Sequence, residues 1–443
     1  SDLNSVEVKF PEDSLSSDVS GSVLKDGLPR DKWRMISVPA RLDEDDVAAV
    51  LDYALGDKKS TTWAVRQWNG EDWEESTELE PGKGYWLIHD VKAEFPFTTG
   101  SGYSVDQSEY KYELQPGWNM IGNPYPFPVN LNIQESNIYG PITYGWTGEG
   151  WSSPEALFLP WAGYAVYNRW VVPATLVLKP IEAPTQITRK IVAEPDGWKL
   201  NIGAYGDTYI DPGNAVGRLS GSLEELDFRD NPEPPYMDGY VSVVMPRSEW
   251  NANISNFTSD IRSLAEPEGV WDIQLRVKEE TSPVSLSFSM EGDFPSEHDI
   301  VLLDLIKRET HHLKEISSLT INQNWDKFPI YPFKVIAGSP EYVSFMTQEI
   351  LSQLPDRFTL HQNYPNPFNP TTTIQFDLPT DESVSLTVYD ILGRTVIEPV
   401  KNINYQAGTY SIVFDGSPLS SGVHFYILQA GRYHKIRKML VIK

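Results

Sequence analysis

Apolar and polar residues alternate with a period of two through much of the second half of this 443-residue chain. The alternation is clear in residues 271–277, 284–288 and 333–336, and residues typical of turns separate the runs. A period of two places every second side chain on the same face of a strand, so each run predicts a strand with one buried face. Several such strands joined by turns favour two stacked sheets, and residues 187–348 are therefore predicted to form a jelly-roll-like β-sandwich.

The last part of the chain, residues 349–443, shows the same alternation in shorter runs. Six or seven short strands separated by turn residues are typical of a small immunoglobulin-like sandwich, which we expect to fold on its own. The apolar positions that carry this prediction are Ile374, Phe376, Leu378, Val384, Leu386, Val388, Tyr410, Ile412, Phe414, Val423, Phe425 and Ile427.

Three aromatic blocks occur twice, in the same order, between residues 31 and 179. Each copy has a short apolar strand that ends at a Pro or just before one, a Gly turn between two Trp residues, and a turn that leads into a Gly-Tyr strand. The pattern predicts a duplicated, aromatic-rich β module in residues 1–186, with copies at about 31–108 and 109–186. The blocks are residues 33–39, 68–73 and 79–86 in the first copy, and residues 118–124, 146–151 and 159–165 in the second.

One segment of the first copy departs from the strand pattern. Its apolar residues Val47, Val50, Leu51 and Leu55 recur at a spacing that places them on one face of a helix. Residues 44–56 are thus predicted to form a short amphipathic helix in a chain that is otherwise all-β.

Composition narrows the functional classes. The formal net charge of −26 disfavours binding to nucleic acid or to anionic membranes. The absence of Cys excludes disulfides, thiolate catalysis and Cys-ligated metals. No apolar run approaches the ~20 residues of a membrane-spanning helix, so we expect no membrane span. The first residues do not resemble a signal peptide, which suggests that one was removed or that the chain is part of a longer precursor.

The excess of acidic residues is confined to the part of the chain before residue 356. From residue 356 on, the chain holds 8 Lys and Arg and 7 Asp and Glu. The segment opens with Phe358-Thr359-Leu360-His361-Gln362-Asn363-Tyr364-Pro365-Asn366-Pro367-Phe368-Asn369-Pro370 and continues with Val388-Tyr389-Asp390-Ile391-Leu392-Gly393-Arg394. It ends with Phe414-Asp415-Gly416, the block at 419–426 and Lys438-Met439-Leu440-Val441-Ile442-Lys443. In this order the blocks resemble the type A C-terminal sorting domain of type IX secretion. The one departure is His424, where the family usually has a small or polar residue.

The resemblance covers about residues 356–443 and implies that this domain is an export address. In that family the outer-membrane secretion machinery reads the domain, and a sortase commonly removes it before the cargo is attached to surface polysaccharide or released. The upstream modules resemble those of large exported bacterial surface proteins. The implied location is the cell surface or the medium. The residues expected to carry the sorting signal are Tyr364, Pro365, Asn366, Pro367, Phe368, Asn369, Pro370, Gly393, Gly422, Tyr426, Lys438 and Lys443.

Two features of this tail also have a physical interpretation. Its three Pro residues fix φ and remove backbone donors, so residues 364–370 are predicted to be a rigid extended lead-in rather than a central strand. Residues 431–443 hold five Lys and Arg and no acidic residue. This basic final strand is either a docking edge for a partner or a solvated edge strand whose charges prevent aggregation.

The sequence contains no recognisable catalytic motif. Its seven His include no His-Glu-x-x-His spacing, and it has neither a Gly-x-Ser-x-Gly elbow nor a phosphate-binding loop. We therefore expect no enzyme activity in this chain and place any catalytic domain upstream of it.

An acidic loop at residues 207–238 is the candidate metal site. It concentrates carboxylate and amide oxygens, which are the ligands that Ca²⁺ prefers, although the EF-hand spacing is absent. The alternative is a solvated acidic face. The candidate ligands are Asp207, Asp211, Asn214, Glu224, Asp227 and Asp230.

The 14 Trp residues raise the question of glycan binding, because exposed indole rings stack on sugars. Three pairs recur at matching positions of the two copies, which indicates a shared core. Trp161 and Trp170 lie outside these pairs and are the candidate ligand residues. Two functions remain open: a structural display region with an export tag, or a module that binds glycans or other surface ligands. The recurring pairs are Trp33 with Trp118, Trp68 with Trp146, and Trp73 with Trp151.

Overall fold

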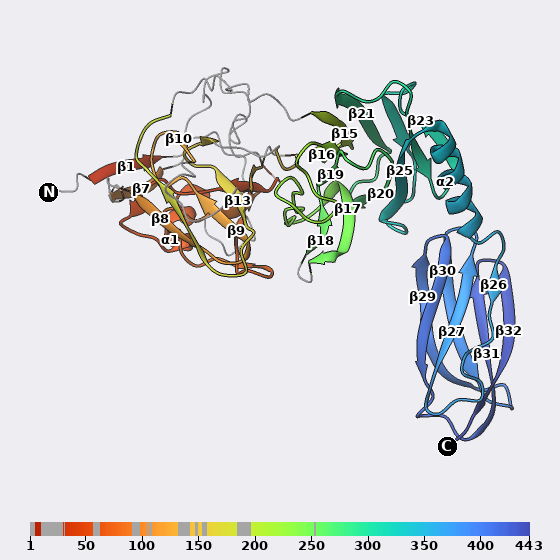
Figure 1. The fold of residues 1–443 in the computed structure, drawn as a ribbon. Helices are drawn as coiled ribbons and strands as arrows, with labels where there is room; N and C mark the ends of the chain where they lie inside the picture. Colours follow the sequence, from red (N-terminus) through yellow and green to blue (C-terminus); the bar gives the residue numbers. More distant parts are fainter. Residues whose placement is uncertain are drawn as a thin grey trace. The chain divides into compact units, whose positions relative to one another are not determined.

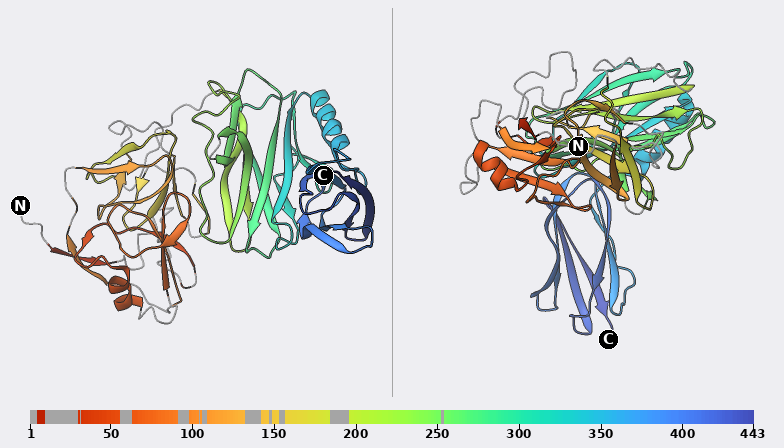
Figure 2. Two further views of the ribbon diagram at one scale, coloured as in Figure 1. Left: turned by 90° about the horizontal axis from the view of Figure 1, so that it is seen from below. Right: turned by 90° about the vertical axis from the view of Figure 1, so that its left-hand side faces the viewer.

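A computed structural model gives the fold of the chain (Figures 1 and 2). The chain forms two compact units. The first comprises the described residues up to Ala265 together with Ser282–Phe294 and Ser318–Thr320, and the second comprises Glu266–Thr281, Pro295–Ser317 and Ile321–Lys443. The structure describes residues 5–9, 30, 32–55, 63–90, 98–103, 105, 109–131, 142–146, 149–152, 157–183, 196–251 and 254–443.

The first copy of the duplicated module forms a four-stranded sheet in the order β2-β6-β4-β5. The predicted helix is confirmed as α1 (Val47–Leu55), which buries Val47, Val50 and Leu51 in the core of this copy. Position Gly56 of that prediction lies outside the described residues. The strands are β2 (Arg34–Ile36), β4 (Trp63–Trp68), β5 (Trp73–Glu75) and β6 (Tyr85–His89).

The second copy has the corresponding strand order, β9-β13-β11. Backbone hydrogen bonds join the two copies, because the N–H of Gly84 donates to the carbonyl of Met120 and the N–H of Gly122 donates to that of Gly82. Positions Thr147 and Gly148 of the second Trp turn, and the predicted boundary near residue 186, lie outside the described residues. The strands are β9 (Gly117–Gly122), β11 (Ile142–Gly145) and β13 (Gly163–Asn168).

Smaller sheets complete the module. One has three strands in the order β1-β7-β3, and two are two-stranded pairs, β8 with β14 and β10 with β12. Their strands are β1 (Ser5–Lys9), β3 (Arg41–Leu42), β7 (Thr98–Tyr103), β8 (Tyr110–Leu114), β10 (Val129–Asn130), β12 (Leu157–Phe158) and β14 (Ala174–Leu178).

The rest of the first unit contains a five-stranded sheet in the order β19-β16-β15-β21-β24, and β17 paired with β18. Alternate residues of these strands are buried, as the period-two pattern predicts. The strands are β15 (Gly197–Tyr205), β16 (Ile210–Leu219), β17 (Tyr240–Asn251), β18 (Ile254–Phe257), β19 (Ser259–Ser263), β21 (Val284–Gly292) and β24 (Ser318–Ile321).

In the second unit, strands β20, β25, β22 and β23 lie side by side in that order, and a helix covers part of this sheet. This helix, α2 (Pro340–Gln353), was not predicted. The Ser339 hydroxyl accepts the N–H of Tyr342, and Pro340 occupies the first turn, so the N-terminus is well capped. The strands are β20 (Gly269–Lys278), β22 (Asp299–Asp304), β23 (Glu309–His312) and β25 (Ile330–Gly338).

The C-terminal sandwich has sheets in the orders β26-β27-β30 and β29-β28-β31-β32, an immunoglobulin-like arrangement. Its core is built entirely from residues 358–441, so the domain has a hydrophobic core of its own. The all-β sandwich class is confirmed. Within the described ranges, no helix is long and apolar enough to cross a membrane. The strands are β26 (Thr359–Leu360), β27 (Thr371–Leu378), β28 (Glu382–Tyr389), β29 (Thr395–Tyr405), β30 (Gly408–Asp415), β31 (Gly422–Ala430) and β32 (Tyr433–Val441).

Candidate functional site

The lead-in, defined here as residues 361–370, forms backbone hydrogen bonds to both sheets of the C-terminal domain. Tyr364 and Thr373 of β27 exchange two bonds, of 3.0 and 2.9 Å. Phe368 donates its N–H to the carbonyl of Leu440 and accepts the N–H of Ile442, each at 3.0 Å. The lead-in thus connects the start of the domain to the end of its last strand.

The shape of the lead-in differs from the prediction. It is not a central strand, as expected, but it is not extended either, because the chain bends at residues 365–367 and again at 369–370. The peptide bonds before Pro365, Pro367 and Pro370 are all cis. The Pro residues fix φ at their own positions, but φ alone does not decide whether the segment runs straight or bends. The expectation of an extended segment was therefore wrong.

Phe368 anchors the lead-in in the core. Its side chain is only 3% exposed, and its ring centroid lies 6.3 Å from that of Phe414. Gly416 lies against this ring, and a Cβ at position 416 would come within 2.6 Å of Phe368 Cε2. The N–H of Gly416 also donates to the carbonyl of Pro370 at 2.8 Å. The close approach of the lead-in therefore explains why Phe occupies position 414 and Gly occupies position 416.

Side chains of the lead-in cover the end of β32. Asn366 accepts the N–H of Leu440 through Oδ1 at 2.9 Å, and Gln362 Nε2 donates to the carbonyl of Lys438 at 2.7 Å. Both outward backbone groups of Leu440 and the carbonyl of Lys438 are thus bonded within the domain. The addition of a partner strand at Leu440 is disfavoured, because its backbone groups already have partners.

The hydroxyl of Tyr426 fixes the start of the lead-in. Tyr426 is fully buried, donates to the carbonyl of His361 at 2.8 Å and accepts the N–H of Asn363 at 2.8 Å. The Asn363 side chain is also buried, and its Nδ2 donates to Thr372 Oγ1 at 3.0 Å. Asn363 and Thr372 are structural residues of this site that the predicted sorting residues did not include, although Asn363 belongs to the block that opens the domain.

Replacing Tyr426 with Phe is expected to destabilise the C-terminal domain by about 1–3 kcal/mol, because two buried backbone groups lose their partner. Urea unfolding of residues 356–443, followed by circular dichroism, measures the change. Tyr364→Phe is the matched control, since Tyr364 is 81% exposed and its removal of a hydroxyl should change stability by less than ~0.5 kcal/mol. Equal midpoints for the two variants would contradict the assigned role of Tyr426.

The remaining sorting residues lie on turns or at the chain end. Gly393 and Gly422 adopt φ angles of +76° and +134°, which favour Gly over other residues. Pro367 and Asn369 are exposed. The Nζ of Lys443 donates to the carbonyl of Ser417 at 2.7 Å, so the last residue is held against the turn that precedes β31.

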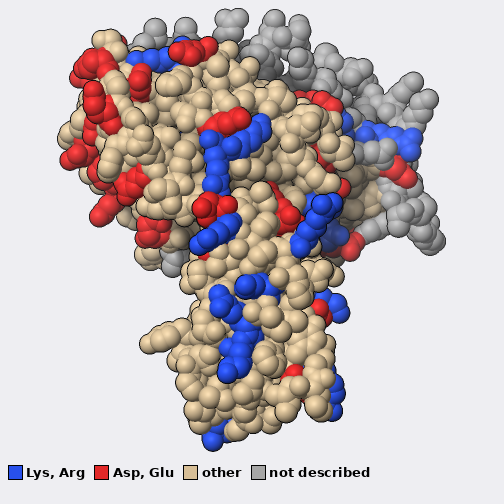
Figure 3. Space-filling model, turned by 90° about the vertical axis from the view of Figure 1, so that its right-hand side faces the viewer, with Lys and Arg blue, Asp and Glu red and all other residues tan. Residues whose placement is uncertain are grey.

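Basic side chains are prominent on one face of the domain. Figure 3 shows Lys and Arg gathered there with few acidic residues, in contrast to the acidic upstream part of the sequence. Residues Arg432, Lys435 and Lys438 on or beside β32 are exposed. Both interpretations of the basic strand, a docking surface and a solvated edge, remain compatible with this distribution.

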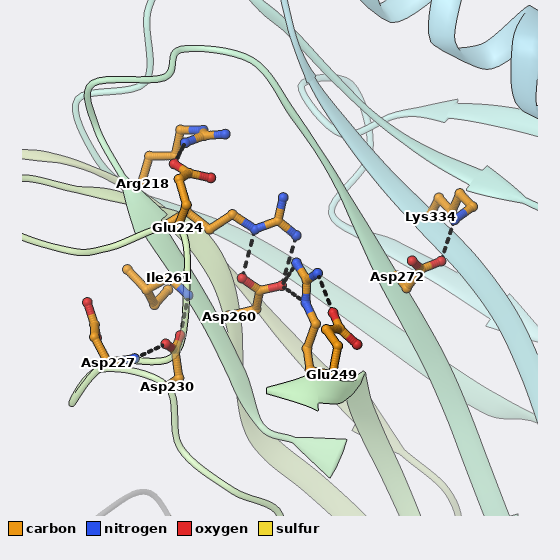
Figure 4. A network of polar contacts seen from close by, with 11 residues as sticks. Arg218, Glu224, Asp227, Asp230, Glu249, Asp260, Ile261, Asp272 and Lys334 are labelled. Carbon is orange, nitrogen blue, oxygen red and sulfur yellow. Dashed lines mark hydrogen bonds and ion pairs between the residues drawn. The ribbon is translucent and has the colours of Figure 1, made fainter. Parts of the chain in front are cut away.

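In the first unit, the carboxylates of the predicted calcium loop bond to protein groups (Figure 4). Asp230 is buried and accepts the N–H groups of Asp227 and Ile261 at 2.8 and 2.9 Å. Asp227 accepts the N–H of Arg229 at 2.7 Å, and Glu224 pairs with Arg218 at 2.7 Å. These carboxylates therefore brace the loop itself.

The other three predicted ligands also bond within the protein. Asp211 accepts the N–H of Val243 at 2.7 Å, Asn214 donates to the carbonyl of Ile202 at 3.3 Å, and Asp207 accepts the hydroxyl of Ser282. Within the described ranges, no group of three or more His, Cys, Asp or Glu side chains is placed to hold a metal ion. Calcium binding stays a prediction, and a melting temperature lowered by chelator would support it.

Beside the loop, Asp260 is buried between two arginines (Figure 4). Its carboxylate accepts Nε and Nη2 of Arg262, both at 2.9 Å, and Nε and Nη2 of Arg247 at 2.9 and 2.6 Å. Burial raises the pKa of Asp260 to about 6, and Arg247 opposes that rise. The carboxylate is therefore ionised at neutral pH and paired with two cations.

The stability of the first unit is expected to fall as the pH rises from about 4 to about 7. Burial raises the pKa of Asp230 to about 7, so the folded chain keeps this proton to a higher pH than the unfolded chain. Unfolding then releases a proton across this window, at a cost to stability of up to about 1.4 kcal/mol per pH unit. Denaturant unfolding of the wild type and of Asp230→Asn at pH 5 and 7 measures the slope. The unfolding free energy of the variant should change less between pH 5 and pH 7 than that of the wild type. An equal change in the two proteins would contradict the assignment to Asp230.

The recurring Trp residues belong to the core, as predicted. Trp146 and Trp151 are buried and pack edge to face with each other and with Trp86, which is also buried but does not recur; the centroids are 4.9 to 5.8 Å apart. The partly buried members Trp33, Trp68, Trp73 and Trp118 pack against this cluster.

The two candidate ligand Trp residues differ. Trp161 is 8% exposed and packs in the core of the first copy, so its ring faces are not open to a ligand and this prediction requires correction. The sequence could not reveal this, because Trp161 lies in the second copy but contributes to the core of the first. Trp170 is 48% exposed in the turn between β13 and β14.

Comparison with known families assigns a function to the C-terminal domain. Residues 362–443 match the family model described as the secretion system C-terminal sorting domain, which confirms the resemblance seen in the sequence. No curated protein was found to match the chain. The matched segment starts within the lead-in and reaches Lys443. It therefore includes Phe368 and the two residues to which its backbone bonds, Leu440 and Ile442. The protein is therefore exported by type IX secretion, to the cell surface or out of the cell.

Proposed function

We propose that this chain is the non-catalytic C-terminal region of an exported surface protein. Its last domain is the address that the type IX machinery reads at the outer membrane, and the upstream β modules space and display a part of the precursor that lies before them. The carrying observation is that the matched segment 362–443 coincides with a sandwich that has its own core. A self-contained domain can serve as an address for any cargo, because it does not depend on the cargo for its fold.

A sortase is proposed to act on the exported protein, and surface polysaccharide is the proposed attachment point. Both follow from the sorting-domain family. Mass spectrometry of the surface-exposed protein would identify this step, because removal of the domain leaves a new C-terminus upstream of residue 362. Surface protein that still contains residues 362–443 would argue against cleavage.

The test of the address is a fusion of residues 356–443 to a periplasmic reporter in a host with type IX secretion. The reporter is expected on the cell surface or in the medium. The matched controls are the reporter without the domain and the same fusion in a strain that lacks the machinery. A fusion that stays in the periplasm of the competent host would overturn the proposal.

A second candidate function is the binding of glycans or other surface ligands by the upstream modules. The observation that favours it is the exposed apolar turn formed by Trp170, Val171 and Val172, whose exposed fractions are 48%, 91% and 57%. Arg169 supports this turn by donating to the carbonyls of Asp227 and Phe228, both at 2.8 Å. Saturable binding of a polysaccharide that is lost in Trp170→Ala would favour this function, and no binding across a broad panel would favour display.

A further inference from the structure

The turn between β28 and β29, residues 390–394, presents two large aliphatic side chains to solvent. Ile391 and Leu392 are 70% and 72% exposed. The turn itself is held by Asp390, whose Oδ1 accepts the N–H groups of Leu392 and Arg394 at 2.9 and 3.0 Å. Two backbone bonds between residues 390, 393 and 394 close the turn further.

The geometry of this turn does not depend on the two aliphatic side chains. Asp390 Oδ2 also accepts Nε of Arg394 at 2.7 Å, and these hydrogen bonds hold the pKa of Asp390 below its usual range. Gly393 provides the positive φ that the turn requires. Ile391 and Leu392 belong to no part of the domain core. Adjacent large apolar residues on a rigid turn are therefore best explained by a partner that covers them.

We propose that Ile391 and Leu392 dock into an apolar pocket of the protein in the secretion machinery that recognises this domain. The inference rests on the proposed function of the domain as an export address. The turn lies inside the matched segment 362–443. A turn that is already ordered loses little conformational entropy on binding. A few buried apolar anchors can then supply a large share of the binding free energy of an interface.

The turn also lies at the same end of the sandwich as the C-terminus. Strand β28 ends at Tyr389 opposite Phe425, and the next pairs of the sheet lead to Gly422 opposite Val441. Two further apolar side chains at this end are exposed, Tyr364 by 81% and Ile442 by 50%. The opposite end receives the chain from α2. The apolar turn therefore lies at the end of the domain farthest from the point where cargo is attached.

A protein pocket is a better partner than a lipid surface. The two side chains carry about eight carbon atoms, fewer than a myristoyl chain, which alone gives only marginal membrane binding. Arg394, with 74% of its side chain exposed, and the ionised Asp390 flank them directly. A fitted pocket can cover two aliphatic groups and leave these charges in water.

The test compares export of three reporter fusions to residues 356–443 in a type IX-competent host. The double variant Ile391→Ser with Leu392→Ser is expected to reduce surface reporter at least ~10-fold, as loss of a buried anchor does in other interfaces. Val413→Ser is the matched control, because Val413 is 75% exposed on β30 but lies outside the turn. Its export should equal that of the unaltered fusion. The purified double variant should keep the melting temperature of the unaltered domain.

The outcomes separate the inference from the function on which it rests. If the unaltered fusion stays in the periplasm, the address itself is refuted. If the unaltered fusion and the double variant reach the surface equally, the docking inference fails and the address stands. If the double variant melts lower, the single variants Ile391→Ala and Leu392→Ala replace it, and each must reduce export. Flotation of the purified domain with phosphatidylethanolamine and phosphatidylglycerol vesicles, lost in the double variant, would replace the protein pocket by a lipid surface.

Discussion

Replacing Phe368 with Ala is expected to lower the free energy of unfolding of the C-terminal domain by about 3–5 kcal/mol. The ring is 3% exposed, lies against Gly416 and is packed near Phe414, so its removal leaves a cavity in the core. The loss also weakens the contact between the lead-in and β32, because the backbone of Phe368 bonds to Leu440 and Ile442. Urea unfolding of residues 356–443 by far-ultraviolet circular dichroism measures the change.

The matched control for this variant is Val413→Ala, which removes methyl groups from a side chain that is 75% exposed. Its expected change is below ~0.5 kcal/mol, because little apolar surface is buried there. The domain can be studied by itself, since its core contains only residues 358–441. A Phe368→Ala domain as stable as the Val413→Ala domain would show that the lead-in does not anchor the fold.

Replacing Asp260 with Ala is expected to destabilise the first unit by about 3–5 kcal/mol, the range seen when one partner of a buried ion pair is removed. Arg262 would keep its charge in a largely buried position, and Arg247 would lose two bonds to the carboxylate. Denaturant unfolding of the full chain, followed by Trp fluorescence, reports mainly on the first unit, because 12 of the 14 Trp residues lie between residues 33 and 250. Trp250, which lies 4.8 Å from the Arg247 guanidinium, is a nearby probe.

Glu249 offers a matched control for Asp260, because it pairs with the same Arg247 at 3.2 Å but its side chain is 60% exposed. Glu249→Ala should cost less than ~1 kcal/mol, since solvent screens an exposed ion pair. If the two variants unfold at the same denaturant concentration, Asp260 does not contribute more than a surface charge does.

The sequence predicted the features that depend on a regular pattern. The period-two runs correspond to strands such as β20 and β27, and the apolar spacing at Val47, Val50 and Leu51 corresponds to α1. The repeated Trp positions indicated a shared core, because identical buried environments require similar side chains. The motifs at both ends of the C-terminal domain indicated its family, and the structure shows that these two ends contact each other.

Other features were missed. Helix α2 was omitted although its signals are present in the sequence: Ser339 and Pro340 suit a capped N-terminus, and Val343, Met346 and Ile350 recur at helical spacing. The roles of the acidic residues depend on tertiary contacts instead. The acidic loop was interpreted from the density of its charges, whereas the structure assigns Asp230 and Asp227 to backbone N–H groups. No sequence pattern distinguishes a carboxylate that accepts backbone N–H groups from one that binds a cation.

The contact of the lead-in with the last strand affects the order of events during synthesis. The N-terminal part of a domain leaves the ribosome first, but a domain generally folds as a unit. Here the segment around Phe368 needs Leu440 and Ile442 as partners, so it cannot complete its contacts until residues 440–442 have been synthesised. The export address thus stays unfinished while the preceding domains are made, and a product that stops short of β32 never acquires it.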